Sequence, residues 1–324
     1  MSRLLLGVDG GNTKTVAVVV AEEGAVLGSG RGGCGDIHNA RGAAAAVEQI
    51  AHAATAALDA AGVGAADLGA AAFSLAGADW PEDFTHLHGE LRRRLALAED
   101  PEIVNDAVGG LRCGSDDMVG VAVVIGTYSA IAGRNAQGDL FHLGFWPDST
   151  GAHALGSQAL AAIWRHMLGL GPATSLLERA LARWEAADAE GLLHVLTRID
   201  GAAEETEAAS FAEAVLDEAE GGDRIAQTIV QTVAGRMGDY ARVCAERTGQ
   251  LGAPFPLVLC GSVLRHPSPL LRSVLLSRVP HAEPVFPDLE PVAGAVLLAA
   301  DRVGAHPELT QLRVSQAVAP EPGG

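Results

Sequence analysis

Two apolar, β-branched runs, residues 4–8 and 15–20, flank the turn Asp9-Gly10-Gly11-Asn12-Thr13-Lys14. The runs predict neighbouring strands, and the turn is longer than the two-residue loop that a simple hairpin needs. Its adjacent glycines let the backbone approach an anionic oxygen closely and present successive N–H groups to it. We therefore expect a hairpin whose turn binds phosphate. An ordinary hairpin turn built on Asp-Gly is the alternative.

Lys14 is the only lysine among the 22 basic residues of the chain, and it lies in this turn. A compact ammonium on a flexible stem suits a mobile phosphate, although an ordinary exposed lysine is the simpler interpretation. Asp9, at the end of the first run, offers the carboxylate oxygen that Mg²⁺ prefers. The predicted phosphate-binding residues are Gly10, Gly11, Asn12, Thr13, Lys14 and Thr15.

The same order of features returns in the middle of the chain. An apolar run at 119–125, the turn Gly126-Thr127-Tyr128 and a second run at 129–134 repeat the first pattern, and residues 151–248 are almost wholly helical in character. Strand-like and helix-like segments alternate elsewhere, which predicts an α/β fold. The repeat and the length of 324 residues together predict two domains.

Composition excludes several classes of partner. The formal net charge is -18, which disfavours binding to nucleic acid or to an anionic membrane surface. No apolar run reaches the roughly 18 residues of a membrane span, and the first residues lack a signal-peptide pattern, so we expect a soluble, cytoplasmic protein. The four cysteines are widely spaced and predict neither a disulfide framework nor a zinc site.

Four further segments follow the first turn in a specific order: Asn105-Asp106-Ala107, Ile125-Gly126-Thr127-Tyr128-Ser129, residues 257–265, and Pro291-Val-Ala-Gly-Ala295. The five together resemble the superfamily of ATPases that contains sugar kinases, actin and the heat-shock chaperone ATPases. Within it, the chain is most similar to the BadF/BadG/BcrA/BcrD ATPase family. That family includes N-acetylglucosamine kinases and the activator ATPases of benzoyl-CoA reductase and hydroxyacyl-CoA dehydratases.

The resemblance implies a two-domain actin-like ATPase (ribonuclease H-like) fold, with a cleft between the domains that binds ATP and Mg²⁺. We expect an N-terminal domain at residues 1–112 and a C-terminal domain with a helical insertion at 113–304. The last helix, near 290–303, is expected to pack back on the first domain, and 305–324 to form a flexible tail.

The resemblance also implies roles for particular residues. Asp106 becomes the general base that accepts a proton from the attacking hydroxyl, although a helix N-cap is its alternative role. Gly126 and Thr127 form the second phosphate loop, and Gly261 and Ser262 lie against the nucleoside. Asp9 is the implied metal anchor.

Three segments resemble the acceptor site of the kinase branch, and they add Asp36, Gly77, Phe145, Trp146 and Asp148 as candidate sugar contacts, together with Asp106 and Tyr128. Carboxylates suit hydroxyl recognition, and an indole ring can stack on a sugar face. The chain departs from the pattern at four positions. Tyr128 replaces a glycine, Ser149 a glutamate, Ser262 a glycine and Asp36 an asparagine.

The expected activity is therefore an ATP-dependent kinase that phosphorylates a hydroxyl, expected to be the primary one, of a hexosamine such as N-acetylglucosamine or glucosamine. The alternatives are an activator ATPase coupled to a partner enzyme, and a sugar or nucleotide sensor with weakened turnover, which Tyr128 favours. We further expect a homodimer.

Overall fold

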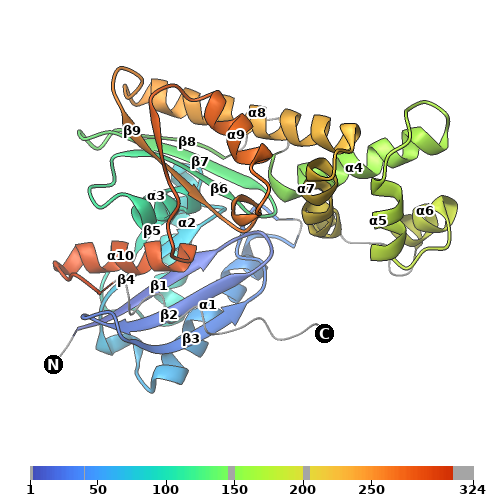
Figure 1. Cartoon of the computed structure of the whole chain (residues 1–324). Helices are drawn as coiled ribbons and strands as arrows, with labels where there is room; N and C mark the ends of the chain where they lie inside the picture. Colours follow the sequence, from blue (N-terminus) through green and yellow to red (C-terminus); the bar gives the residue numbers. More distant parts are fainter. Residues whose placement is uncertain (1–2, 40, 145–149, 200–204, 309–324) are drawn as a thin grey trace.

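The structure is a computed structural model, and it describes residues 3–39, 41–144, 150–199 and 205–308. Its first sheet has the strand order β3-β2-β1-β4-β5, with β2 antiparallel to β1 and β3, and β4 parallel to β1 and β5 (Figure 1). The strands are β1 (Leu4–Gly10), β2 (Thr15–Ala21), β3 (Val26–Gly32), β4 (Leu68–Leu75) and β5 (Glu102–Asn105). The predicted hairpin is confirmed, with Gly10 opposite Thr15.

The second sheet repeats the first, strand for strand. Its order is β10-β9-β6-β7-β8, with antiparallel pairs β6–β7 and β7–β8 and parallel pairs β6–β9 and β9–β10. The strands are β6 (Gly120–Ile125), β7 (Ser129–Arg134), β8 (Leu140–Leu143), β9 (Phe255–Cys260) and β10 (Ala282–Val285). The repeat in the sequence is thus a repeat of whole sheets, and the α/β prediction is confirmed.

Helices cover both faces of the first sheet. Because successive strand residues point to opposite faces, Leu6 and Val8 pack with α1 (Ala43–Ala61) and α2 (Pro81–Leu95), whereas Leu5 packs with α10 (Pro291–Val303). Along β3 the glycines alternate, and a Cβ on Gly30 would lie 2.1 Å from the Ala53 carbonyl oxygen. The α1 backbone therefore lies directly on β3.

The second sheet is covered by the helical region (Figure 1). Val121, Val123 and Ile125 of β6 form one core with helices of this region, and all three are fully buried. The helices and 3₁₀ segments are α4 (Gly151–Met167), α5 (Leu176–Arg183), α6 (Ala189–Thr197), η2 (Glu205–Phe211), α7 (Ala212–Glu220), α8 (Arg224–Arg247), η3 (Val263–Arg265) and α9 (Leu270–Ser277). Of these, α5 and α6 extend away from the sheet as the outer part of the insertion.

Two helices connect the sheets, because each follows a strand of one sheet and packs against the other sheet. Helix α3 (Asp106–Gly114) follows the last strand of the first sheet but packs with Ala122 and Val258 of the second. Helix α10 follows the last strand of the second sheet but packs on β1 and β4 of the first. The two helices cross at glycine, where a Cβ on Gly294 would lie 2.0 Å from the Gly109 carbonyl oxygen. The two sheets are thereby held together by a close crossing of α3 and α10.

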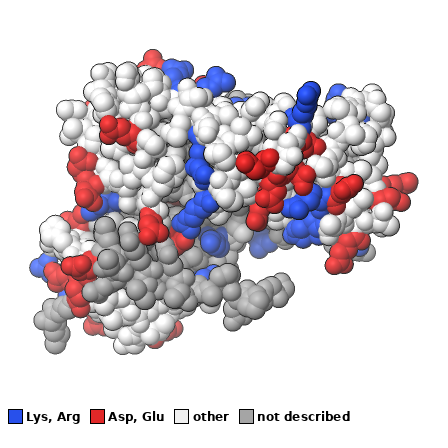
Figure 2. Space-filling view, viewed as in Figure 1, with Lys and Arg blue, Asp and Glu red and all other residues white. Residues whose placement is uncertain are grey.

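Surface features are consistent with the composition. Acidic and basic side chains are mixed on the face drawn in Figure 2, including over the helical insertion. Among the described residues, no helix is both long and apolar enough to cross a membrane.

Candidate active site

The first glycine-rich turn closes on itself and exposes two polar side chains. The Gly11 N–H donates to the Lys14 carbonyl at 2.9 Å, and Thr13 and Lys14 are exposed at the tip. Thr15 lies inside the fold instead: it is fully buried, and its hydroxyl donates to the Gly33 carbonyl at 2.9 Å. The Thr15 hydroxyl is thus committed to holding the turn and, unlike the exposed Thr13, does not face a ligand as the sequence led us to expect.

The second turn faces the first across the two sheets. Thr127, between β6 and β7, lies with its Oγ1 atom 2.6 Å from the Thr13 Oγ1 atom, although 114 residues separate them. The Gly126 and Thr127 carbonyls accept the Ala152 and His153 N–H groups at 3.1 and 2.8 Å, so the start of α4 fixes the shape of this turn. The structure therefore brings the two predicted phosphate loops together.

Two half-buried carboxylates lie beside these turns. Burial raises the pKa of Asp9 to about 7, with the Lys14 ammonium opposing the shift. Burial raises the pKa of Asp106 to about 8, and the charges of Asp9 and Asp79 add to that rise. The Asp106 Oδ1 atom is buried and has no hydrogen-bond partner among the described residues. Asp9 and Asp106 thus form a coupled pair that disfavours full ionisation, as expected for a base or a cation site.

Asp106 is not the helix cap. The Asn105 Oδ1 atom accepts the Ala107 N–H at 3.0 Å, which makes Asn105 the N-cap of α3 and Asp106 its first residue. The alternative that Asp106 is the N-cap of α3 is therefore wrong, because Asn105 performs that role. The Asp106 carboxylate is left available for other chemistry.

The first acceptor segment contacts the phosphate turn directly. Asp36 accepts the Asn12 side-chain amide at 2.8 Å and the His38 N–H at 2.9 Å. A Cβ on Gly77 would lie 2.7 Å from the Asp36 Oδ1 atom, so a larger residue would displace that carboxylate. Asn12, Asp36 and Gly77, predicted for different parts of the site, thus form one cluster.

Tyr128 lies at the opening of the second turn. It is exposed, and its ring lies 5.2 Å from the His153 ring, centroid to centroid. The predicted contacts Phe145, Trp146 and Asp148, and the departure at Ser149, lie outside the described residues. The indole-stacking prediction therefore stays a prediction.

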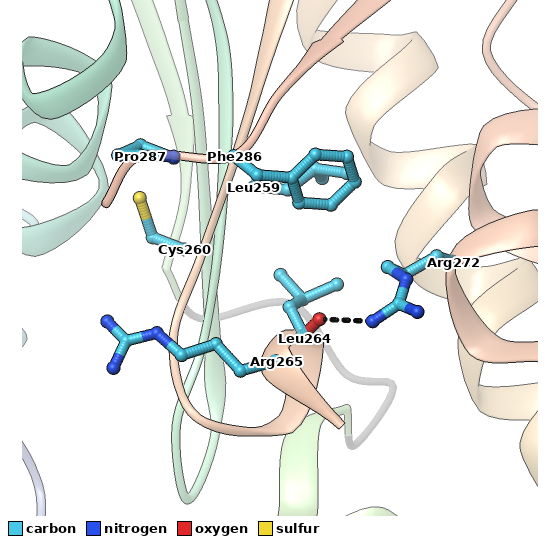
Figure 3. Close-up of a pocket in the computed structure, with 7 residues that line it drawn as sticks. All are labelled: Leu259, Cys260, Leu264, Arg265, Arg272, Phe286 and Pro287. Atoms are coloured by element: carbon cyan, nitrogen blue, oxygen red, sulfur yellow. Dashed lines mark hydrogen bonds between the residues drawn. The ribbon is translucent and has the colours of Figure 1, made fainter. Parts of the chain in front are cut away.

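The predicted nucleoside residues follow β9. A Cβ on Gly261 would lie 2.1 Å from the Ile125 carbonyl oxygen, so glycine is required here by packing against β6. Ser262 is exposed at the start of η3. Beside this segment lies a cavity of about 430 Å³, lined by Leu259, Cys260, Leu264, Arg265, Arg272, Phe286 and Pro287 (Figure 3). These residues include no carboxylate, which argues against a metal or acceptor role for the cavity.

Asn105 and His142 were given no role from the sequence, and Asp79 was named only as the last residue of the segment Ser74-Leu-Ala-Gly-Ala-Asp79 that resembles the acceptor site. Asp79 receives the Asn105 side-chain amide at 3.0 Å, and the His142 Nδ1 atom lies 3.7 Å from the same Asp79 oxygen. A signal for Asp79 exists, since parallel neighbours β4 and β5 end together and polar residues after them must meet. His142 gives no such signal, because its approach depends on how the two sheets are placed.

Comparisons with known proteins find similar sequences and similar folds. An N-acetyl-D-glucosamine kinase of Dictyostelium discoideum is 25% identical over 312 residues, which are 91% of this chain and 97% of the relative. The crystal structure of a Chromobacterium violaceum protein, provisionally named an N-acetylglucosamine kinase, superposes with a TM-score of 0.70 at 22% identity, covering 92% of this chain and 99% of that one.

A ROK-family glucokinase from Streptomyces griseus, crystallised with glucose and AMPPNP, gives a TM-score of 0.58 at 18% identity, covering 91% of this chain and 98% of that one. Likeness at this level of identity shows the shared two-domain fold. The family model of the BadF/BadG/BcrA/BcrD ATPases matches residues 6–299, nearly the whole described chain. This protein therefore belongs to the BadF/BadG/BcrA/BcrD ATPase family.

Proposed function

We propose that this protein is an ATP-dependent sugar kinase that transfers the γ-phosphoryl group to the primary hydroxyl of a hexosamine. N-acetylglucosamine and glucosamine are the first acceptors to test. The proposal is supported by family membership and by the Dictyostelium relative, which is named an N-acetyl-D-glucosamine kinase and aligns over nearly its whole length.

The contact between Thr13 and Thr127 is the observation on which the proposal chiefly rests. It places two phosphate-type turns from separate sheets opposite each other. Asp106 lies close enough to Asp9, the first residue of the first turn, for the Asp9 charge to raise the pKa of Asp106. A triphosphate held between the turns would thus have its terminal group near a carboxylate that can accept a proton.

In the proposed reaction, the acceptor hydroxyl attacks the γ-phosphorus while its proton passes to the Asp106 carboxylate. The bond from the γ-phosphorus to the bridging oxygen breaks, and ADP leaves with that electron pair. The raised pKa of Asp106 makes its carboxylate a stronger proton acceptor than an ordinary aspartate. Thr13, Thr127 and Lys14 would neutralise and orient the phosphate oxygens, so most of the catalysis comes from positioning.

The residues present fit a magnesium ion. Asp9 offers a carboxylate oxygen at the end of β1, and burial makes its ionised form costly without a neighbouring cation. Bound there, Mg²⁺ would neutralise charge on the phosphates. We propose Asp9 as its anchor, directly or through water.

The activity test is ADP release with a panel of amino sugars and neutral hexoses, with NMR of the product to locate the phosphate. We expect a hexosamine to stimulate ADP release and to be recovered as its 6-phosphate. Asp36, which has replaced an amide, should favour acceptors with donor groups, since a carboxylate only accepts hydrogen bonds. The kinase proposal fails if no sugar raises ADP release above background while the protein still binds nucleotide, which is the behaviour of a sensor.

The cysteines argue against the activator ATPase alternative. An iron–sulfur cluster shared at a dimer interface needs accessible thiolates. Cys244 and Cys260 are buried, which raises the pKa of both thiols to about 12, and Cys113 packs against α10 with its sulfur 3.8 Å from the Glu290 carbonyl. A brown, iron-containing preparation would reverse this conclusion.

We also propose that the protein is a homodimer. The proposal draws support from apolar side chains exposed on the helical insertion, among them Leu168 and Leu170, which are 72% and 62% exposed. Light scattering coupled to size exclusion measures the mass directly, and a monomer at micromolar concentration would contradict the proposal.

A further inference from the structure

Asp79 lies where two parallel strands of the first sheet end. Strands β4 and β5 pair with Leu75 opposite Asn105, and Asp79 follows β4. The Asp79 side chain is only 6% exposed, and its Oδ1 atom accepts the Asn105 side-chain amide at 3.0 Å. Asn105 is 3% exposed. The two residues thus form a buried pair, and Asn105 directly precedes the proposed base, Asp106, in the chain.

This pair fixes the start of α3. The other end of the Asn105 amide, its Oδ1 atom, accepts the Ala107 N–H at 3.0 Å. Both ends of the amide are therefore engaged, and the side chain cannot rotate without losing one bond. Because Asp106 lies between the cap and Ala107, the orientation of Asn105 determines where the Asp106 carboxylate points.

The second domain contacts Asp79 at the same oxygen. The Nδ1 atom of His142, on β8, lies 3.7 Å from Asp79 Oδ1, and this nitrogen has no hydrogen-bond partner among the described residues. A Cβ on Gly144, just past β8, would lie 2.1 Å from the same oxygen. The end of β8 therefore fits against the Asp79 carboxylate only because residue 144 is glycine. Strand β8 belongs to the sheet that also carries Thr127.

Among the described residues, the charged groups closest to Asp79 are engaged in local hydrogen bonds. His38, Asp79 and Asp83 place one ligand-type atom each within 4.8 Å of one another. However, the Asp83 Oδ2 atom already accepts the Trp80 N–H at 2.8 Å and lies 3.0 Å from the His38 Nε2 atom, so it caps α2. Within the described part of the chain, Asp36 and Asp106 are the other carboxylates whose charge acts on or is affected by Asp79.

We propose that Asp79 is a positioning residue for the proposed kinase reaction. It holds Asn105, and through it Asp106, in the reactive orientation, and it does so when the end of β8 from the second domain is seated against its carboxylate. Asp79 thereby couples domain arrangement to the placement of the base. This inference rests on the proposed function only for its catalytic consequence, since the effect on α3 is structural.

Three variants separate positioning from simple packing. Asp79→Ala removes the acceptor for Asn105, whereas Asp79→Asn keeps an acceptor oxygen of the same shape. We expect Asp79→Ala to lower kcat about 100-fold, the scale of a small misplacement at a reacting centre, with KM for ATP changed less than about threefold. Asp79→Asn should recover most of kcat. Asp188→Ala, which removes an aspartate cap from α6 in the insertion, is the matched control and should leave both constants unchanged.

A fourth variant moves Asp79 without replacing it. In Gly144→Ala the new methyl would displace the end of the Asp79 side chain, which is more easily shifted than backbone. We expect a loss of kcat in Gly144→Ala that disappears when Asp79→Ala is already present, because the two changes act through one contact. Additive losses would overturn the coupling between β8 and Asp79. The Gly144→Ala and Asp79→Asn variants keep the test decisive even if Asp79→Ala does not fold.

Hydrogen exchange distinguishes a failure of this inference from a failure of the proposed function. The Ala107 amide should exchange at least about tenfold faster in Asp79→Ala than in the parent protein, whatever the substrate is, because its cap is released. Unchanged exchange at Ala107, or a kcat that Asp79→Ala leaves intact in an active enzyme, would overturn the positioning role. If the parent protein phosphorylates no sugar, the hydrogen exchange rate of the Ala107 amide still tests whether Asp79 holds the cap of α3.

Discussion

At Asp106, the ionised carboxylate that the proposed activity needs is expected to lower the stability of the folded protein. Burial and the Asp9 and Asp79 charges raise its pKa to about 8 from the ordinary value of 3.8. A carboxyl whose pKa is raised on folding stabilises the folded state fully only below its unfolded pKa. That contribution is lost as pH rises from about 4 through the folded pKa near 8.

Asp106→Asn should therefore stabilise the ligand-free protein at alkaline pH while abolishing turnover. We expect the Tm of Asp106→Asn to exceed that of the parent by a margin that grows between pH 5 and pH 9, and kcat to fall about 1,000-fold. Thermal unfolding across this range and steady-state kinetics test both parts. A Tm difference that stays constant from pH 5 to pH 9 would show that folding does not raise the pKa of Asp106. Full activity of Asp106→Asn would show that Asp106 is not the base.

Lys14 tests the phosphate turn at the same scale. Its ammonium is exposed at the tip of the turn, and arginine at this position keeps the charge with a more rigid geometry. We expect Lys14→Arg to raise KM for ATP less than about fivefold, and Lys14→Met to raise it about 10- to 100-fold, the value of a charge-assisted hydrogen bond. Arg93→Met, an exposed cation on α2, serves as the control. Equal KM values for Lys14→Met and the control would place Lys14 outside the site.

Among the elements, the crossing of α3 and α10 depends on glycine. A Cβ on Gly294 would lie 2.0 Å from the Gly109 carbonyl and 2.9 Å from the Cys113 sulfur, so Gly294→Ala must push the helices apart. We expect a loss of about 1–3 kcal/mol in the free energy of unfolding, the range for overpacked cores. Gly89→Ala on α2 is the matched control, because nothing lies within 4 Å of its added Cβ and it should gain about 0.5–1 kcal/mol. Denaturant unfolding measures both, and a neutral Gly294→Ala would mean that the helices can separate at little cost.

The sequence predicts elements best where one physical signal dominates. The hairpin of β1 and β2 follows from β-branched runs around a glycine turn, and the structure pairs Gly10 with Thr15. Strand β10 escaped prediction because it is four residues long, contains proline and is largely exposed at the sheet edge. After Ser262 the chain forms η3 and then α9 instead of one continuous helix, since Pro267 and Pro269 stand between them.

The candidate site divides in the same way. Local motifs placed Gly10 to Lys14, Gly126, Thr127 and Asp106 near a common centre, because each motif ends a strand of one repeat. The alternative role of Asp106 as the cap of α3 is wrong, and Asn105 was not considered, since sequence cannot tell which of the two turns toward the Ala107 amide. His142 was missed because it reaches Asp79 only through the relative placement of two sheets.

At the scale of the whole molecule, the proposed nucleotide site lies between two halves, and the Thr13 and Thr127 hydroxyls form one contact between them. A ligand that contacts both turns should stabilise the two halves together, and saturation at about 100 times Kd adds about 2.7 kcal/mol. We expect Mg-ADP to raise the Tm of the parent protein, and Thr13→Val with Thr127→Val to lose most of that rise. Thr197→Val is the control, because its hydroxyl bonds only within α6, to the Leu193 carbonyl. Differential scanning fluorimetry measures the Tm of each variant at one fixed nucleotide concentration. Scaling the concentration to the Kd of each variant would hide a change in affinity. An undiminished Tm shift in the double variant would place the nucleotide away from the two turns. That result would also contradict the proposed geometry of phosphoryl transfer.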